Sequence, residues 1–100
     1  MPVPEYDTGV REAVPVGIVM DAEEYGLAVR RRVGERIRQL RDGLGWSQDV
    51  LAELSGIHRN YIGQIERCAI NPGLANLALI ARALGVTIGD LTIDVPDPPN

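Results

Sequence analysis

Two short runs of helical periodicity meet at Gly56, with no space for a loop between them. The first run carries apolar side chains at Val50, Leu51 and Leu54, and the second at Ile57, Tyr61, Ile62 and Ile65. Ser47 precedes the first run as a good N-cap, and glycine readily adopts the left-handed conformation at a helix end. The spacing predicts one buried stripe on each helix and a steep crossing, which is a helix-turn-helix unit.

A longer helix is predicted before this unit, over residues 22–42. Asp21 and Glu24 have the spacing of a capping box, with Asp in place of Ser or Thr. Apolar residues follow in steps of three or four, at Tyr25, Val29, Val33, Ile37, Leu40 and Leu44. Gly26 and Gly34 each weaken this helix by about 1 kcal/mol relative to Ala. Gly43 and Gly45 end it.

Two further helices are predicted after the unit. Residues 71–73 (Asn-Pro-Gly) form a turn, and an amphipathic helix over residues 74–84 ends at Gly85. Thr87 and Asp90 suggest a capped short helix, and residues 92–95 are extended in character. The fold class is therefore all-α, a compact bundle of about five short helices.

These segments resemble the helix-turn-helix family of Cro and phage repressors, also called the xenobiotic-response-element type. The resemblance covers residues 33–94, and its spacing is kept throughout. The matching pieces are ERIRQLR (35–41), GWSQ (45–48), LA (51–52), SGI (55–57), YI (61–62), IER (65–67), NP (71–72) and IARALGV (80–86). It implies a lambda-repressor-like DNA-binding domain, which we expect over residues 22–93. The part before Val33 lies outside the family's domain and either fringes the fold or helps a subunit contact. Residues 1–21 are an N-terminal extension, either flexible or docked as a strand on the domain or on a second subunit, and residues 94–100 are a disordered Pro-rich tail.

The net charge of −4 is unevenly distributed. Residues 30–90 carry +3, and the acidic excess lies in the two flanks. There is no Lys, so every cationic side chain is a guanidinium suited to bidentate contact with phosphate or guanine. A basic DNA-binding face on the middle of the chain is therefore allowed.

Several function classes are disfavoured by composition. One His and one Cys without clustered carboxylates suggest no nucleophile–base pair, so the chain is not expected to be an enzyme. No Cys/His cluster points to a metal, no cofactor is implied, and no sensing domain for a small-molecule ligand is visible. No apolar run spans a membrane and no signal peptide is present, so a cytoplasmic location is expected.

The second helix of the unit, over residues 58–67, carries the predicted base contacts. Ile62 and Ile65 must face the core, which directs Arg59, Asn60 and Gln64 outward. In the family, base-reading side chains occupy these three positions. Arg pairs well with guanine, and Asn or Gln with adenine. The alternative is that the three are solvated polar residues.

Other roles follow from the resemblance. Gln48 would touch the DNA backbone and brace Arg59, although a Gln at a helix start can also be neutral. Ser47, His58 and Asn71 are the further phosphate-contact candidates. For His58 the default is helix capping, and for Asn71 ordinary turn chemistry is an equal alternative. Arg41 and Glu66 match a family ion pair between the first and third helices, with a structural role.

Three departures from the family pattern affect the site. Cys68 stands where Gly is usual, Gly73 replaces a Ser or Thr cap, and Gly63 lies inside the second helix of the unit. Arg36 and Arg38 are interpreted as solvated charges, with contact of one of them to the DNA backbone as the alternative, and Trp46 as the edge of the core.

The predicted function is a sequence-specific regulator of transcription, a repressor that binds double-stranded DNA as a homodimer. The alternative is a protein-interaction module on the same fold, or an antitoxin or restriction–modification controller, with little DNA binding of its own. Salt dependence of DNA affinity distinguishes these classes.

Overall fold

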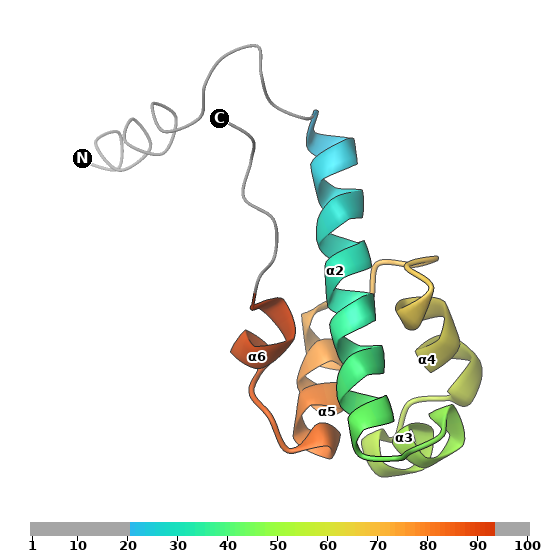
Figure 1. Ribbon diagram of the computed structural model, residues 1–100. Helices are drawn as coiled ribbons and strands as arrows, with labels where there is room; N and C mark the ends of the chain where they lie inside the picture. Colours follow the sequence, from blue (N-terminus) through green and yellow to red (C-terminus); the bar gives the residue numbers. More distant parts are fainter. Residues whose placement is uncertain (1–20, 94–100) are drawn as a thin grey trace, which may run out of the picture.

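The computed structural model describes residues 21–93, which form five helices and no strand (Figure 1). The helices are α2 (Ala22–Gly43), α3 (Gln48–Ser55), α4 (Arg59–Glu66), α5 (Leu74–Leu84) and α6 (Ile88–Thr92). The predicted all-α class is confirmed. The predictions for residues 1–20 and 94–100 lie outside the described residues.

Local capping determines most helix ends. The predicted capping boxes are present at the starts of α2 and α6, where Asp21 accepts from Glu24 N at 2.8 Å and Thr87 accepts from Asp90 N at 3.0 Å. Ser47 caps α3, and Gly56 ends it with φ +79°. Two boundaries differ from the prediction: α2 includes Gly43, and Thr92 is the last residue of α6 rather than part of an extended segment.

The core lies where α2 crosses α4, α5 and α6, with α3 packed against α4 and α5. Its fully buried large side chains are Ile37, Leu51, Ile62, Ile65, Ile80 and Leu91. Trp46 is half-buried against this cluster, as predicted. In Figure 1 the amino-terminal part of α2 extends beyond the other helices. Among residues 21–93, no helix is both long and apolar enough to cross a membrane.

The predicted buried stripe of α3 is confirmed at Leu51 and wrong at Val50 and Leu54. Val50 is 37% and Leu54 52% exposed, whereas Leu51 and Ser55 are buried. Both pairs are spaced by four residues, and the two faces differ by about 100° around the helix. The polar Ser55 tolerates burial because its hydroxyl accepts from Ile57 N at 3.2 Å and lies 3.4 Å from Ala52 O as a donor. Leu44 is also exposed, because it caps α2 instead of continuing the helix.

Gly34 allows α2 and α4 to approach closely. A Cβ atom at this position would stand 2.5 Å from the carbonyl oxygen of Ile65 and 3.0 Å from that of Glu66. The predicted loss of helix propensity at Gly34 is therefore accompanied by a packing role that periodicity alone does not reveal. This close approach fixes α4 against the middle of α2.

Candidate nucleic-acid interface

The outward face of α4 presents a continuous polar strip. We use the name outer strip for the surface formed by Arg59, Asn60, Gly63, Gln64 and Arg67. These residues, together with Gln48, line a shallow hollow of about 280 Å³. Ile62 is 0% and Ile65 2% exposed, so both point into the core as predicted. The inward apolar pair therefore leaves Arg59, Asn60 and Gln64 on one surface.

Both ends of α4 are formed by residues that the sequence singled out. His58 caps the start, since its Nδ1 accepts from Asn60 N at 3.0 Å. At the other end Cys68 adopts φ +52°, a left-handed conformation that favours glycine. Cys68 thus ends the helix in the way that the usual Gly would, and α4 stops at Glu66.

Arg59 is paired with the preceding helix. Its Nε lies 2.9 Å from Oδ1 of Asp49, and the side chains are 56% and 74% exposed. A pair this exposed contributes about 0–1 kcal/mol, so a better partner can displace Asp49. Asp49 was not among the predicted site residues, and its acidic character at the start of α3 was the available signal.

Glu66 joins three helices beneath the outer strip. Arg41 donates from Nε to Oε2 of Glu66 at 2.7 Å and from a terminal nitrogen to Oε1 at 2.9 Å. The other terminal nitrogen donates to the carbonyl oxygen of Trp46 at 2.8 Å. The hydrogen bond with Glu66 raises the pKa of Arg41, against the opposing effect of burial. The predicted structural ion pair is present.

Gln48 also binds this pair. Its Nε2 donates to Oε1 of Glu66 at 3.1 Å. The expectation that Gln48 braces Arg59 is therefore wrong for the structure described here, because the amide group of Gln48 donates to Glu66 and Arg59 pairs with Asp49. Gln48 nevertheless borders the same hollow as the outer strip.

The remaining phosphate-contact candidates divide into two places. Ser47 and Gln48 lie at the start of α3, where backbone N–H groups favour an anion. Asn71 lies apart from the outer strip, and its Oδ1 accepts from Gly73 N at 3.4 Å, as in an Asx turn. Gly73 provides no side-chain cap for α5. These roles in DNA binding stay predictions.

Two arginines of α2 differ from each other. Arg36 was predicted to be solvated, but its Nε donates to the carbonyl oxygen of Asp90 at 3.1 Å and holds α6 against α2. Arg38 is exposed and lies 3.7 Å from Asp42. Within residues 21–93 no group of His, Cys, Asp and Glu could hold a metal ion.

Comparison with known proteins agrees with this geometry. Residues 37–91 match the helix-turn-helix family. The control protein C.SmaI of Serratia marcescens is 37% identical over 71 residues, which are 71% of this chain and 84% of that protein. The restriction–modification controller protein C.AhdI of Aeromonas hydrophila superimposes with a TM-score of 0.61 and 40% identity, over 62% of this chain and 94% of that structure.

SinR, a master regulator for biofilm formation whose structure was solved in complex with DNA, superimposes with a TM-score of 0.57 and 35% identity. The match covers 59% of this chain and 95% of that structure. The family match covers more than half of this chain and includes the helix pair, the outer strip and the ion pair beneath it. The chain belongs to the helix-turn-helix family, of the Cro and phage-repressor (xenobiotic-response-element) type.

Proposed function

We propose that the chain is a sequence-specific regulator of transcription, a repressor in the cytoplasm that binds double-stranded DNA with α4 in the major groove. The observation that carries this is the outer strip, which is held outward because Ile62 and Ile65 are buried. The residues that surround its hollow include Arg59, Arg67 and three amide side chains but no carboxylate. Such a surface offers many donors to phosphates and base edges.

Within this proposal, Arg59, Asn60 and Gln64 contact bases. Arg59 leaves Asp49 for guanine or phosphate, since the exposed ion pair is weak. Ser47, Gln48 and His58 contact the phosphates of the strand near the start of α4. The hydrogen bond from Gln48 to Glu66 is retained, so the Gln48 side chain is already oriented when DNA binds.

Selection of binding sites from random duplexes tests this function. Arg59→Ala should lose discrimination at one base position, by about 1–3 kcal/mol, while the rest of the selected site is unchanged. Gln48→Ala should weaken all sites by a similar factor. Arg82→Ala is the matched control, because Arg82 is an exposed arginine on α5, away from the outer strip. If the protein selects no site, or if Arg59→Ala selects the same bases as the wild type, the assignment is wrong.

Binding as a homodimer is part of the proposal. Two copies of α4 would read half-sites about one helical turn apart, roughly 34–36 Å between centres. The selected site should then have two-fold symmetry, and sedimentation should show two chains on one site. A single asymmetric half-site bound by one chain would contradict this part alone.

A role as restriction–modification controller is a second candidate, favoured by the similarity to C.SmaI and C.AhdI. It predicts that the selected site occurs upstream of a restriction or modification gene. A protein-interaction module or antitoxin predicts instead that duplex affinity is weak and nearly independent of salt, whereas a DNA-binding regulator loses affinity steeply as salt rises.

A further inference from the structure

The amino-terminal half of α2 lies outside the matched family segment and carries three consecutive arginines, Arg30, Arg31 and Arg32. We call residues 22–32 the projecting half. Each residue advances a helix by about 100°. Relative to Gly34, Arg30 and Arg31 are therefore rotated by only about 40° and 60°, and Arg32 by about 160°. Two arginines thus share the side of α2 on which Gly34 lies, and the third faces away.

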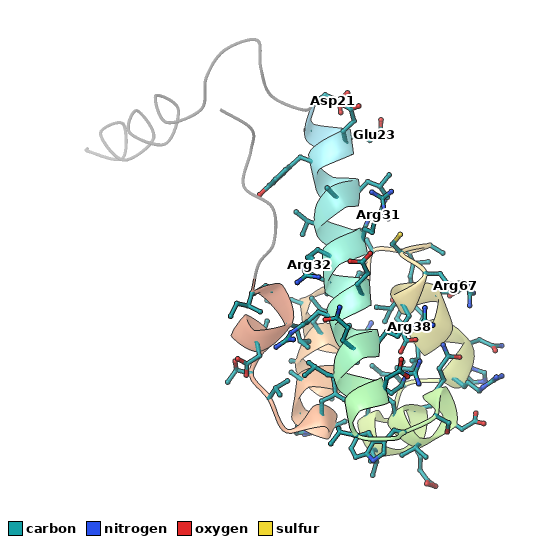
Figure 2. The ribbon with its side chains drawn as sticks, in the orientation of Figure 1. Asp21, Glu23, Arg31, Arg32, Arg38 and Arg67 are labelled. Atoms are coloured by element: carbon teal, nitrogen blue, oxygen red, sulfur yellow. The ribbon has the colours of Figure 1, made fainter. Side chains whose placement is uncertain are left out.

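Gly34 marks where α2 meets the carboxyl end of α4, through the carbonyl groups of Ile65 and Glu66. Arg30 and Arg31 lie about one helical turn before this point, and so just past the end of α4. Figure 2 shows Arg31 on the side of α2 toward α4 and Arg67, and Arg32 on the side toward α6. Arg32 also lies 3.6 Å from Glu35 in an ion pair. The side chains of Arg30 and Arg31 make no ion pair or hydrogen bond within residues 21–93.

The length of α4 matches the width of the groove that it would occupy. Eight residues span about 12 Å, and the major groove of B-DNA is about 12 Å wide. The two ends of α4 therefore approach different strands. Ser47, Gln48 and His58 surround its start, whereas its far end has Arg67 and then the projecting half of α2.

We infer that Arg30 and Arg31 bind phosphates of the DNA strand at the carboxyl end of α4, so that the footprint extends beyond the helix-turn-helix unit. This inference rests on the proposed function. The ligand is the phosphodiester backbone, read without regard to base sequence. Arginine suits it because the guanidinium group is always charged and binds phosphate in a bidentate manner.

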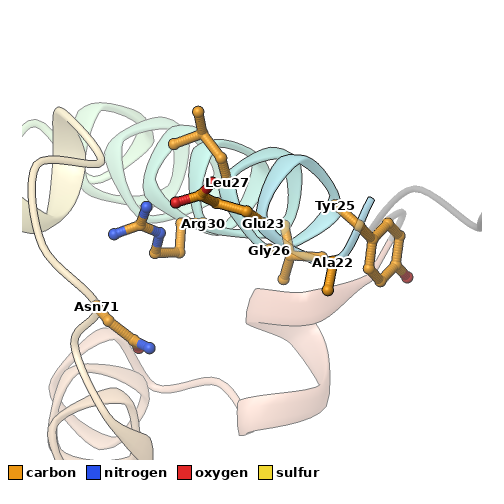
Figure 3. Close-up of a pocket in the computed structure, with 8 residues that line it drawn as sticks. Ala22, Glu23, Tyr25, Gly26, Leu27, Arg30 and Asn71 are labelled. Carbon is orange, nitrogen blue, oxygen red and sulfur yellow. The ribbon is translucent and has the colours of Figure 1, made fainter. Parts of the chain in front are cut away.

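A hollow beside Arg30 brings in one further hydrogen-bond donor, Asn71, in a lining that is otherwise mostly apolar. It has a volume of about 520 Å³ and lies between the projecting half of α2 and Asn71 in the loop after α4 (Figure 3). Asn71 uses its Oδ1 for Gly73 N, which leaves its amide NH₂ group to donate. Glu23 also lines the hollow, but it is two turns, or about 10 Å, from Arg30 along the helix. Asn71 lies apart from the outer strip, but it lines the same hollow as Arg30 and offers a second donor to a phosphate there.

The competing explanation is structural. Cationic side chains near a helix carboxyl end stabilise that end through its dipole, and Arg30 and Arg31 lie near the end of α4. That role would lower thermal stability on substitution without changing the number of phosphates bound. Duplex binding and thermal unfolding must therefore be measured on the same variants.

The test uses the full chain and a fluorescent duplex of mixed sequence, about three helical turns or roughly 30 base pairs long. Affinity is measured over a series of salt concentrations for the wild type, Arg31→Ala and the double variant Arg30→Ala/Arg31→Ala. Arg32→Ala is the matched control, since it removes the same charge from the opposite side of α2. Each lost phosphate contact should reduce the slope of log affinity against log salt by about 0.9, and the double variant by about 1.8. Arg32→Ala should keep the wild-type slope.

The outcomes are distinguishable. An unchanged slope for the double variant overturns the inference and leaves the proposed function intact. The inference is also overturned if Arg32→Ala reduces the salt slope as much as Arg31→Ala does, because such a result would reflect net charge only. A wild type that binds no duplex at any salt concentration overturns both. A reduced slope for the double variant with an unchanged melting temperature supports the phosphate contacts over the dipole explanation.

Discussion

The two halves of α2 have the same apolar spacing and different surroundings. Both carry apolar residues at helical spacing, with Tyr25 and Val29 in the first half and Val33 and Ile37 in the second. Val33, Ile37 and Arg41 are buried in the second half, whereas no residue of the projecting half is buried. Periodicity therefore identified a common face along the whole helix. Only the packing of α4, α5 and α6 against residues 33–43 determines which part of that face is covered.

Each half also contains a glycine in its interior, Gly26 in the first and Gly34 in the second, and their surroundings give the two opposite roles. Gly34 is buried against the backbone of α4, and Gly26 has no heavy atom within 4 Å of its would-be Cβ. The second half is thus fixed by contacts that tolerate no added atom. The first half is only partly covered: Val29 packs against the core cluster, and no residue before Val33 is buried.

The largest effect is expected in the second half, where Arg41 is buried. Arg41→Ala should lower the free energy of unfolding by about 3–5 kcal/mol, because it leaves the nearly buried Glu66 without its partner. Arg38→Ala is the control, since Arg38 is 68% exposed on the same helix, and its loss should cost about 0–1 kcal/mol. Urea unfolding monitored by circular dichroism measures both. Equal losses would show that the Arg41–Glu66 pair has no special weight.

The glycines provide the next largest effect, with opposite signs. Gly34→Ala should destabilise the protein by about 1–3 kcal/mol, because the added methyl group displaces the end of α4. Gly26→Ala should stabilise it by up to about 1 kcal/mol, through helix propensity alone. Thermal unfolding of the two variants gives the comparison. If Gly34→Ala were stabilising as well, the close approach of α2 and α4 would not exist in solution.

A smaller effect concerns α6, which Arg36 holds on the second half of α2. Hydrogen bonds from Thr87 lower the pKa of Asp90, with Arg36 as a weaker cause. A lowered folded-state pKa gives stability that is present above the unfolded-state pKa, about 4, and is lost as pH falls through the folded-state value. Unfolding measured from neutral to acidic pH should show this loss in the wild type. Asp90→Asn keeps an acceptor for the cap and should remove that part of the pH dependence; an unchanged profile would contradict it.

The smallest effect is a local one within the native state. Amide hydrogens of residues 27–32 should exchange faster than those of residues 37–41, because the projecting half can open without breaking the core. Exchange measured by NMR spectroscopy tests this directly. If phosphates bind Arg30 and Arg31, a saturating duplex should slow exchange in residues 27–32. Equal protection of both halves without DNA would mean that the projecting half is packed in solution.

Much of the fold was predictable because its signals are local. Asp21, Ser47 and Thr87 cap helices within three residues of their partners, and Gly56 and Gly85 end helices through their own conformation. The outward direction of the outer strip was also predictable, since Ile62 and Ile65 fix the orientation of α4. These features depend on sequence neighbours and need no knowledge of the tertiary structure.

The wrong predictions concern positions whose burial or hydrogen-bond partner is set by residues distant in the sequence. In a helix as short as α3, apolar character placed Val50 and Leu54 in the predicted stripe beside Leu51, whereas the second buried residue is Ser55. Arg36 contacts Asp90, 54 residues away, so no local pattern indicated that it is an anchor. Gln48 likewise finds Glu66 rather than Arg59. Polar partners at such separations are set by the packing of helices, which periodicity does not encode.

The division of α4 into two faces has an evolutionary consequence. Its inward residues, Ile62, Ile65 and Glu66, make the contacts that hold the helix in place, while Asn60 and Gln64 make no hydrogen bond through their side chains within residues 21–93. Substitutions on the outward face can therefore accumulate without unfolding the chain. With α4 in the proposed role, gene copies descended from this one can diverge in the operators that they recognise while keeping the same scaffold.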